Sequence, residues 1–155
     1  MSIASRVRRT ALALSVVAAV GAAGLSAAPA GAAVGSPQGT LTITPFSPGY
    51  HNVAVFGVVP MSRAEAQGLI NSGHRIVLRL WGEDTFSDDL QMGPYNATIH
   101  ATDKGLEFHK VRLQIDDDVL DEDWGTDELY VGMRLVNGNG ATIRTGETNR
   151  VNGNF

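Results

Sequence analysis

The residues in this chain with the most evident chemistry are carboxylates, gathered into two short stretches. Residues 116–128 contain eight of the sixteen Asp and Glu residues and no Lys or Arg, and residues 83–89 contain four more. So many like charges repel one another and cannot be buried without partners, so both stretches must connect ordered elements. A bound cation would offset this repulsion.

Calcium suits such loops best, because it takes about six to eight oxygen ligands in a flexible cage. An EF-hand is excluded: counting from Asp116, the fifth and sixth positions are Leu120 and Asp121, where the motif requires an oxygen ligand and a Gly. The other interpretation is that acidic connections keep an exported β-protein soluble and its edge strands unpaired. The calcium hypothesis assigns six candidate ligands: Asp84, Asp88, Asp89, Asp121, Asp123 and Asp127.

The first acidic stretch is similar to a known calcium loop. Residues 81–93 read Trp-Gly-Glu-Asp-Thr-Phe-Ser-Asp-Asp-Leu-Gln-Met-Gly, which resembles the third calcium loop of C2 domains. The resemblance implies that aspartates at the tip of a sandwich bind calcium and, through it, acidic phospholipid. Gly82 stands where that family has its first loop Asp, and the spacing from Asp84 to Asp89 is one residue short. The loop also lies in the middle of this chain instead of near its C-terminus, so we do not extend the resemblance to the topology or the membrane role of C2 domains.

The mature chain also resembles small exported bacterial domains that pair a Trp-Gly-Glu-Asp loop with a Glu-Asp-Trp-Gly-x-Asp-Glu-Leu-Tyr loop. Residues 81–84 and 122–130 carry these two patterns here. The resemblance implies a secreted β-sandwich, without an activity. Each Trp has two interpretations, as packing or as a contact to a carbohydrate or protein partner. We expect Trp81 to pack in the core and Trp124, surrounded by charges, to be the surface aromatic.

Histidines offer a second kind of metal chemistry. If a hairpin turns at residues 103–104, His100 faces Glu107 on the opposite strand. His109 then lies on the same face, opposite Thr98. Two imidazoles and a carboxylate are a zinc or copper set. The other interpretation is that these are ordinary histidines on a strand surface.

A hydrolase would need a nucleophile with a base, or a carboxylate pair with one buried member. The chain has no Cys and no Gly-x-Ser-x-Gly motif. Glu83 and Glu128 would supply a pair for glycoside hydrolysis, although acidic proteins offer such pairs commonly. His51 and His74 have no partner nearby in the sequence, and we expect them in loops.

Residues 1–33 have the layout of a secretory signal peptide. Residues 1–9 carry three Arg and no acid, residues 10–25 are apolar and rich in Ala, and small-x-small cleavage sites follow. The apolar segment is short for a membrane anchor, which needs about 20 residues. Residues 34–40 are expected to form a flexible lead-in and residues 41–155 a single domain.

Charge and cysteine content narrow the class of the mature protein. Without the leader, nine basic and sixteen acidic residues remain, a net charge of −7. This charge disfavours nucleic acid and anionic membrane as partners. The absence of cysteine excludes a disulfide framework. The domain must therefore depend on its core, or on an ion that binds only the folded state.

Alternation of apolar and polar residues predicts most of the ordered elements. Ser62 and Glu65 form a capping box that begins one helix of about two turns, and residues 137–140 form a tight turn. The patterns predict strands over residues 41–44, 51–59, 75–81, 90–92, 95–101, 106–115, 129–136 and 141–148. Seven or eight short strands with one helix predict an all-β fold, an antiparallel β-sandwich that is Ig-like or C2-like. A small β-barrel is the alternative.

These observations predict a secreted, non-enzymatic binding module that two acidic loops stabilise through calcium. Its partner would be a protein or a carbohydrate, and neither nucleic acid nor, after signal cleavage, a membrane. Two alternatives stay open: an exported hydrolase that uses a carboxylate pair, and a protein–protein module such as an enzyme inhibitor.

Overall fold

The structure is a computed structural model that describes residues 34–83, 88–121 and 126–155. The chain divides into two units, Met1–Ala30 and Gly31–Phe155, and every described residue belongs to the second. No helix in the described part of the chain is long and apolar enough to span a membrane.

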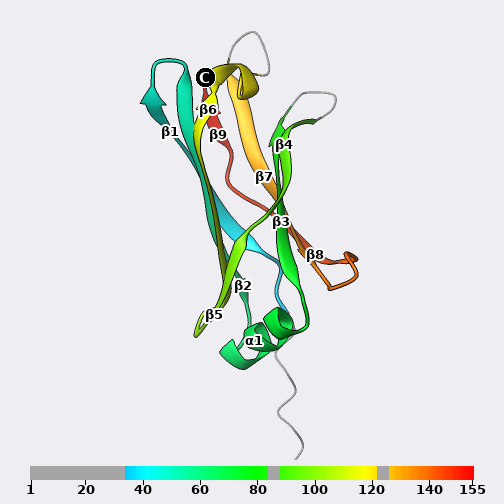
Figure 1. Cartoon of the computed structure of the whole chain (residues 1–155). Helices are drawn as coiled ribbons and strands as arrows, with labels where there is room; N and C mark the ends of the chain where they lie inside the picture. Colours follow the sequence, from blue (N-terminus) through cyan, green and yellow to red (C-terminus); the bar gives the residue numbers. More distant parts are fainter. Residues whose placement is uncertain (1–33, 84–87, 122–125) are drawn as a thin grey trace, which may run out of the picture. The chain divides into compact units, whose positions relative to one another are not determined.

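The described residues form two antiparallel sheets packed together, with one short α-helix (Figure 1). A four-stranded sheet has the order β1-β2-β6-β5, and a five-stranded sheet has the order β4-β3-β7-β8, with β9 also paired to β7. The elements are β1 (Gln38–Ser47), β2 (Tyr50–Pro60), α1 (Arg63–Asn71), β3 (Arg75–Gly82), β4 (Asp89–Asn96), β5 (Thr98–Thr102), β6 (Gly105–Asp116), the 3₁₀ turn η1 (Asp117–Val119), β7 (Asp127–Val136), β8 (Thr142–Glu147) and β9 (Val151–Gly153).

The predicted β-sandwich is confirmed, and the sheets do not close into a barrel. The two strand orders match those of the immunoglobulin sandwich, with β4 as an added edge strand beside β3. The described part of the chain has nine strands instead of seven or eight. The ninth, β9, is only three residues long, too short for alternation to mark it.

The core lies between the sheets and follows from the alternation in each strand. On β3, Ile76, Leu78 and Leu80 face inward and are at most 4% exposed. Phe108 on β6 is 2% exposed and belongs to the same cluster. Phe155, the last residue, packs against this cluster, as its apolar character predicts.

The helix α1 begins at the predicted capping box. The Ser62 hydroxyl accepts from the Glu65 backbone N–H, and the Glu65 carboxylate accepts from the Ser62 N–H. A hydrogen bond from the Ser62 hydroxyl to this carboxylate lowers the pKa of Glu65. The helix joins β2 of one sheet to β3 of the other, as the sequence predicts.

One predicted strand, over residues 95–101, proves to be two. Strand β4 pairs with β3, whereas β5 pairs with β6 in the other sheet, and the chain changes sheet at Ala97. Alternation continues through the change, because both strands bury every second residue. The sequence pattern therefore cannot separate one long strand from two short ones.

Replacing Phe108 by Ala should lower the free energy of unfolding by about 3–5 kcal/mol, because it removes a buried ring and leaves a cavity. Phe56, on the neighbouring strand β2, is 54% exposed and provides a matched control. Phe56→Ala should cost about 1 kcal/mol or less. Urea denaturation measures both variants, and equal losses would contradict the division into core and surface.

Candidate functional site

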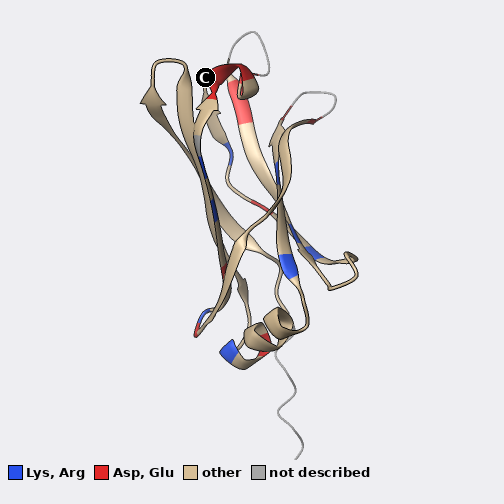
Figure 2. Ribbon diagram, in the orientation of Figure 1, with Lys and Arg blue, Asp and Glu red and all other residues tan. Residues whose placement is uncertain are grey.

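The two acidic connections leave neighbouring strands at the same end of the sandwich. The β3–β4 connection begins after Gly82, and the β6–β7 connection ends at Asp127. Gly82 lies opposite Leu129, and the Glu83 N–H donates to the carbonyl of Glu128 at 2.9 Å. Asp and Glu residues gather at this end (Figure 2). We call it the acidic end, defined by the described residues 83, 88–89, 116–121 and 126–128.

Several carboxylates of the acidic end are paired with donors from the same domain. Asp88 accepts a hydrogen bond from the Tyr130 hydroxyl at 2.6 Å. Glu83 binds the Arg150 guanidinium, and Asp117 contacts His51 Nδ1 at 2.7 Å. The contact corrects the expectation for His51, which lies in β2 and has a partner far away in sequence.

These pairs alter the proton affinity of two groups. Burial raises the pKa of Tyr130 above its ordinary value, and the hydrogen bond to Asp88 and the negative charge of that carboxylate act in the same direction. The hydrogen bond to Glu83 raises the pKa of Arg150, with a further contribution from Glu147.

The predicted calcium ligands fall into three groups. Asp88, Asp89 and Asp121 are exposed, and Asp127 is buried with 2% of its surface exposed. No group of three or more Asp, Glu or His among the described residues could hold a metal ion. Calcium binding by the complete loops stays a prediction, because Asp84 and Asp123 lie outside the described residues, as does Trp124.

The predicted register of the β5–β6 hairpin is confirmed. His100 lies opposite Glu107, and Thr98 lies opposite His109. The two imidazoles stack on each other with ring centroids 5.7 Å apart, and His109 also stacks on Phe56. The described residues form no group that could hold a metal ion, so the zinc or copper set gains no support from the structure. They form an aromatic row on the outer face of the four-stranded sheet.

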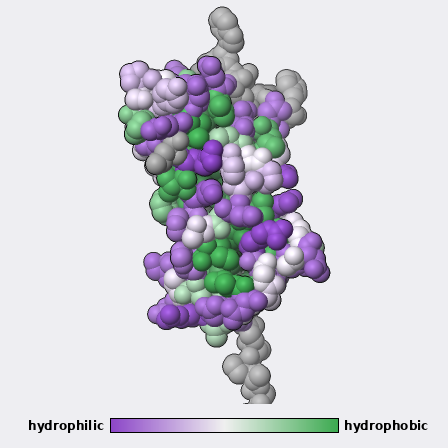
Figure 3. Space-filling view, viewed as in Figure 1, coloured by the Kyte–Doolittle hydropathy of each residue, from purple (hydrophilic) through white to green (hydrophobic). Residues whose placement is uncertain are grey.

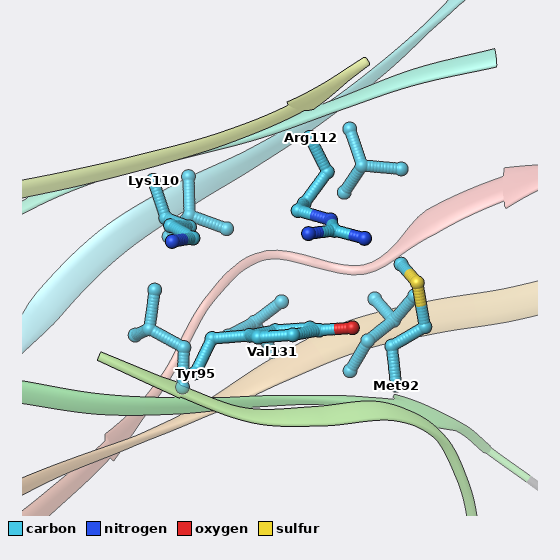
Figure 4. A pocket seen from close by; sticks show the side chains of 9 residues that line it. Met92, Tyr95, Lys110, Arg112 and Val131 are labelled. Carbon is cyan, nitrogen blue, oxygen red and sulfur yellow. The ribbon is translucent and has the colours of Figure 1, made fainter. Parts of the chain in front are cut away.

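A small apolar cavity lies between the sheets on their open side. Tyr95 of β4 closes it, and Lys110 and Arg112 of β6 point at the Tyr95 ring, at 5.8 and 5.0 Å from its centroid (Figure 4). In the orientation of Figure 1, hydrophobic residues are visible on the surface and are bordered by hydrophilic ones (Figure 3). The cavity volume of about 20 Å³ is room for little more than one water molecule. We therefore interpret it as a packing gap covered by two cations.

A larger hollow lies on the outer face of the five-stranded sheet and is lined by Arg75, Arg79 and Arg134. We call these three residues the arginine face. Arg75 pairs with Val136, and Arg134 pairs with Val77, so Arg134 is the diagonal neighbour of both other arginines. The hollow has a volume of about 370 Å³, the size of a small-ligand site.

The three side chains of the arginine face differ from the other Lys and Arg side chains, because they have no ion-pair, hydrogen-bond or aromatic partner among the described residues. Arg63, Lys104 and Arg150 form ion pairs with carboxylates, and Arg144 donates to backbone carbonyls. Lys110 and Arg112 lie over an aromatic ring. The Nε atoms of Arg79 and Arg134 are buried without a hydrogen-bond partner. A buried, unsatisfied donor costs about 1–3 kcal/mol, more when it is charged.

A second hollow of about 270 Å³ adjoins the first and shares Arg79 and Arg134 with it. Trp81 and Gly132 line it, and Trp81 is partly exposed. This corrects the expectation that Trp81 packs in the core. The alternation on β3 places Trp81 on the same face as Arg79, opposite to Leu80.

Sequence reasoning missed the arginine face. Its third member, Arg134, belongs to β7 and lies 52 residues after Gly82, the last residue of β3. Only the pairing of β3 with β7 brings it beside the other two. A comparison with protein families found no match, and comparisons with curated proteins and with solved structures found none either.

Tyr130 should stay protonated when the pH rises above 10, the ordinary pKa of its side chain. In the unfolded chain it ionises near that pH, so its contribution to stability is complete below pH 10 and is lost progressively above it. Unfolding experiments at a series of alkaline pH values should therefore give a steeper loss for the wild type than for Tyr130→Phe. Identical slopes would contradict the pKa shift.

Proposed function

We propose that the mature chain is a secreted, non-enzymatic binding module that holds an anionic ligand on the arginine face. One observation carries the proposal: three guanidinium groups share a hollow and have no carboxylate partner among the described residues. The leader-like residues 1–33 support the secreted location.

Folding alone does not account for three adjacent arginines. Their aliphatic stems can shield Val77 and Val136, which lie on the same face and are 9% and 1% exposed. A Gln or Thr would shield these valines without bringing three positive charges together. Like charges on neighbouring strands destabilise a sheet. An anion in the hollow would offset this repulsion.

The guanidinium group selects the chemistry of the ligand. It is planar, stays charged at any ordinary pH and donates two parallel hydrogen bonds to a carboxylate, phosphate or sulfate. The net charge of the mature chain repels anions in general. Binding must therefore come from the local geometry of the three arginines, not from a broad positive field.

Arg134 is the test position, because it is the diagonal neighbour of both other arginines. Citrate, which carries three carboxylates, should bind the wild type in isothermal titration calorimetry. Arg134→Gln should weaken binding at least about tenfold, since it removes charge-assisted hydrogen bonds. The same variant should be as stable as the wild type or slightly more stable, because it relieves like-charge repulsion.

Arg63→Gln provides a control of equal charge change. Its side chain is 69% exposed and pairs with Asp103, away from the hollow. It should bind citrate with wild-type affinity. If citrate does not bind, or if both variants weaken it equally, the arginine face is not an anion site.

Calcium binding at the acidic end is a second candidate function. The observation that favours it is that both acidic connections leave neighbouring strands, with Glu83 hydrogen-bonded to the backbone of Glu128. Carboxylates and backbone carbonyls from two adjacent loops are the ligands that calcium prefers. Calcium would then stabilise the module instead of being its partner.

Thermal melting in millimolar calcium and in chelator tests this second function. Calcium at about a hundred times its dissociation constant should add about 2–3 kcal/mol to the free energy of unfolding, because it binds only the folded state. Magnesium at equal concentration provides the control, since it demands a stricter octahedral site. An unchanged melting midpoint across millimolar calcium would contradict calcium binding.

A further inference from the structure

The two hollows on the outer face of the five-stranded sheet form one groove. They share Arg79 and Arg134, and together they extend along β3 from Arg75 to Trp81. Six residues of a strand span about 20 Å. The groove is therefore longer than a single small anion, and the side chains that line it differ between its two ends.

The end of the groove at Trp81 has a different chemistry from the end at Arg75. Trp81 is partly exposed there, and its indole Nε1 has no hydrogen-bond acceptor among the described residues. Gly132 of β7, diagonal to Trp81, leaves room for the indole: a Cβ on it would lie 3.0 Å from Trp81 Nε1. Thr145 adds a hydroxyl to the same hollow. This end offers one flat apolar ring surface beside hydrogen-bonding groups.

A ring with an apolar face and a hydroxylated edge matches the end at Trp81, and carboxylates match the three arginines. We infer that the ligand of the arginine face is an acidic oligosaccharide, with one sugar ring on Trp81 and its carboxylates on the guanidinium groups. This inference rests on the proposed function. A ring-free anion would use the arginines and make no contact with the Trp81 ring.

Carboxylates near Trp81 set the direction of such a chain. Glu147 lines the hollow that contains Trp81, and Asp88 accepts a hydrogen bond from Tyr130, which lines the same hollow. These carboxylates would repel further acidic sugars. The oligosaccharide therefore ends near Trp81 and continues past Arg75, because the lining of the hollow at Arg75 includes no acidic residue.

Trigalacturonate and citrate test this inference, because each carries three carboxylates and only the first has sugar rings. Trp81 is the sole tryptophan in a Trp124→Phe background. In that background trigalacturonate should change the fluorescence of Trp81, and citrate should bind with little change. Trp81→Leu in the full chain should weaken trigalacturonate about five- to tenfold, the loss of one stacking contact, and leave citrate affinity unaltered. Maltotriose, a neutral trisaccharide, should not bind.

The outcomes separate this inference from the proposed function. If Trp81→Leu weakens both probes equally or neither, the ligand is not a sugar, although Arg134→Gln can still confirm an anion site. If neither probe binds the wild type, both ideas are wrong. Binding of maltotriose as tight as that of trigalacturonate would show a sugar site that does not need the arginines. Trp81→Phe, which retains a smaller ring, should have an intermediate affinity, and thermal melting verifies that each variant is folded.

Discussion

The antiparallel pairing of β3 with β7 is the constraint on which the rest of this structure depends. Eight residue pairs run without a register shift from Arg75 opposite Val136 to Gly82 opposite Leu129. A slip of one residue would turn every side chain to the other face of the sheet. The inward side chains of both strands would then lose the core, so burial holds the register. That register in turn decides what lies on the outer face and which connections meet at the end of the sheet.

Charges of opposite sign lie in different places around β3 and β7. At the acidic end, Arg150 binds Glu83 and His51 contacts Asp117, so these two carboxylates have partners within the fold. The arginine face has no such match among the described residues. Because desolvated charge without a partner is costly, the two regions differ in how far the described part of the domain compensates their charges.

Several features could be predicted from the sequence because they depend on neighbours along the chain. The capping box needs only Ser62 and Glu65, and the β5–β6 register follows from the position of one turn. The antiparallel sandwich follows from alternation and turn spacing. The division of residues 95–101 between two sheets could not be predicted, since a change of partner leaves alternation intact. The surface position of Trp81 follows from the alternation of β3, in contrast to the expectation that it packs in the core.

The sequence by itself determined most of the strands, the helix and its cap, the register of the β5–β6 hairpin, and the presence of two acidic connections. Tertiary structure decided which strands are neighbours, and therefore that the two connections leave the same end and that Arg134 lies beside Arg75 and Arg79. The physical reason is that local patterns state which face of a strand is buried but not which strand lies next to it. That choice is made by the packing of all the strands around one core.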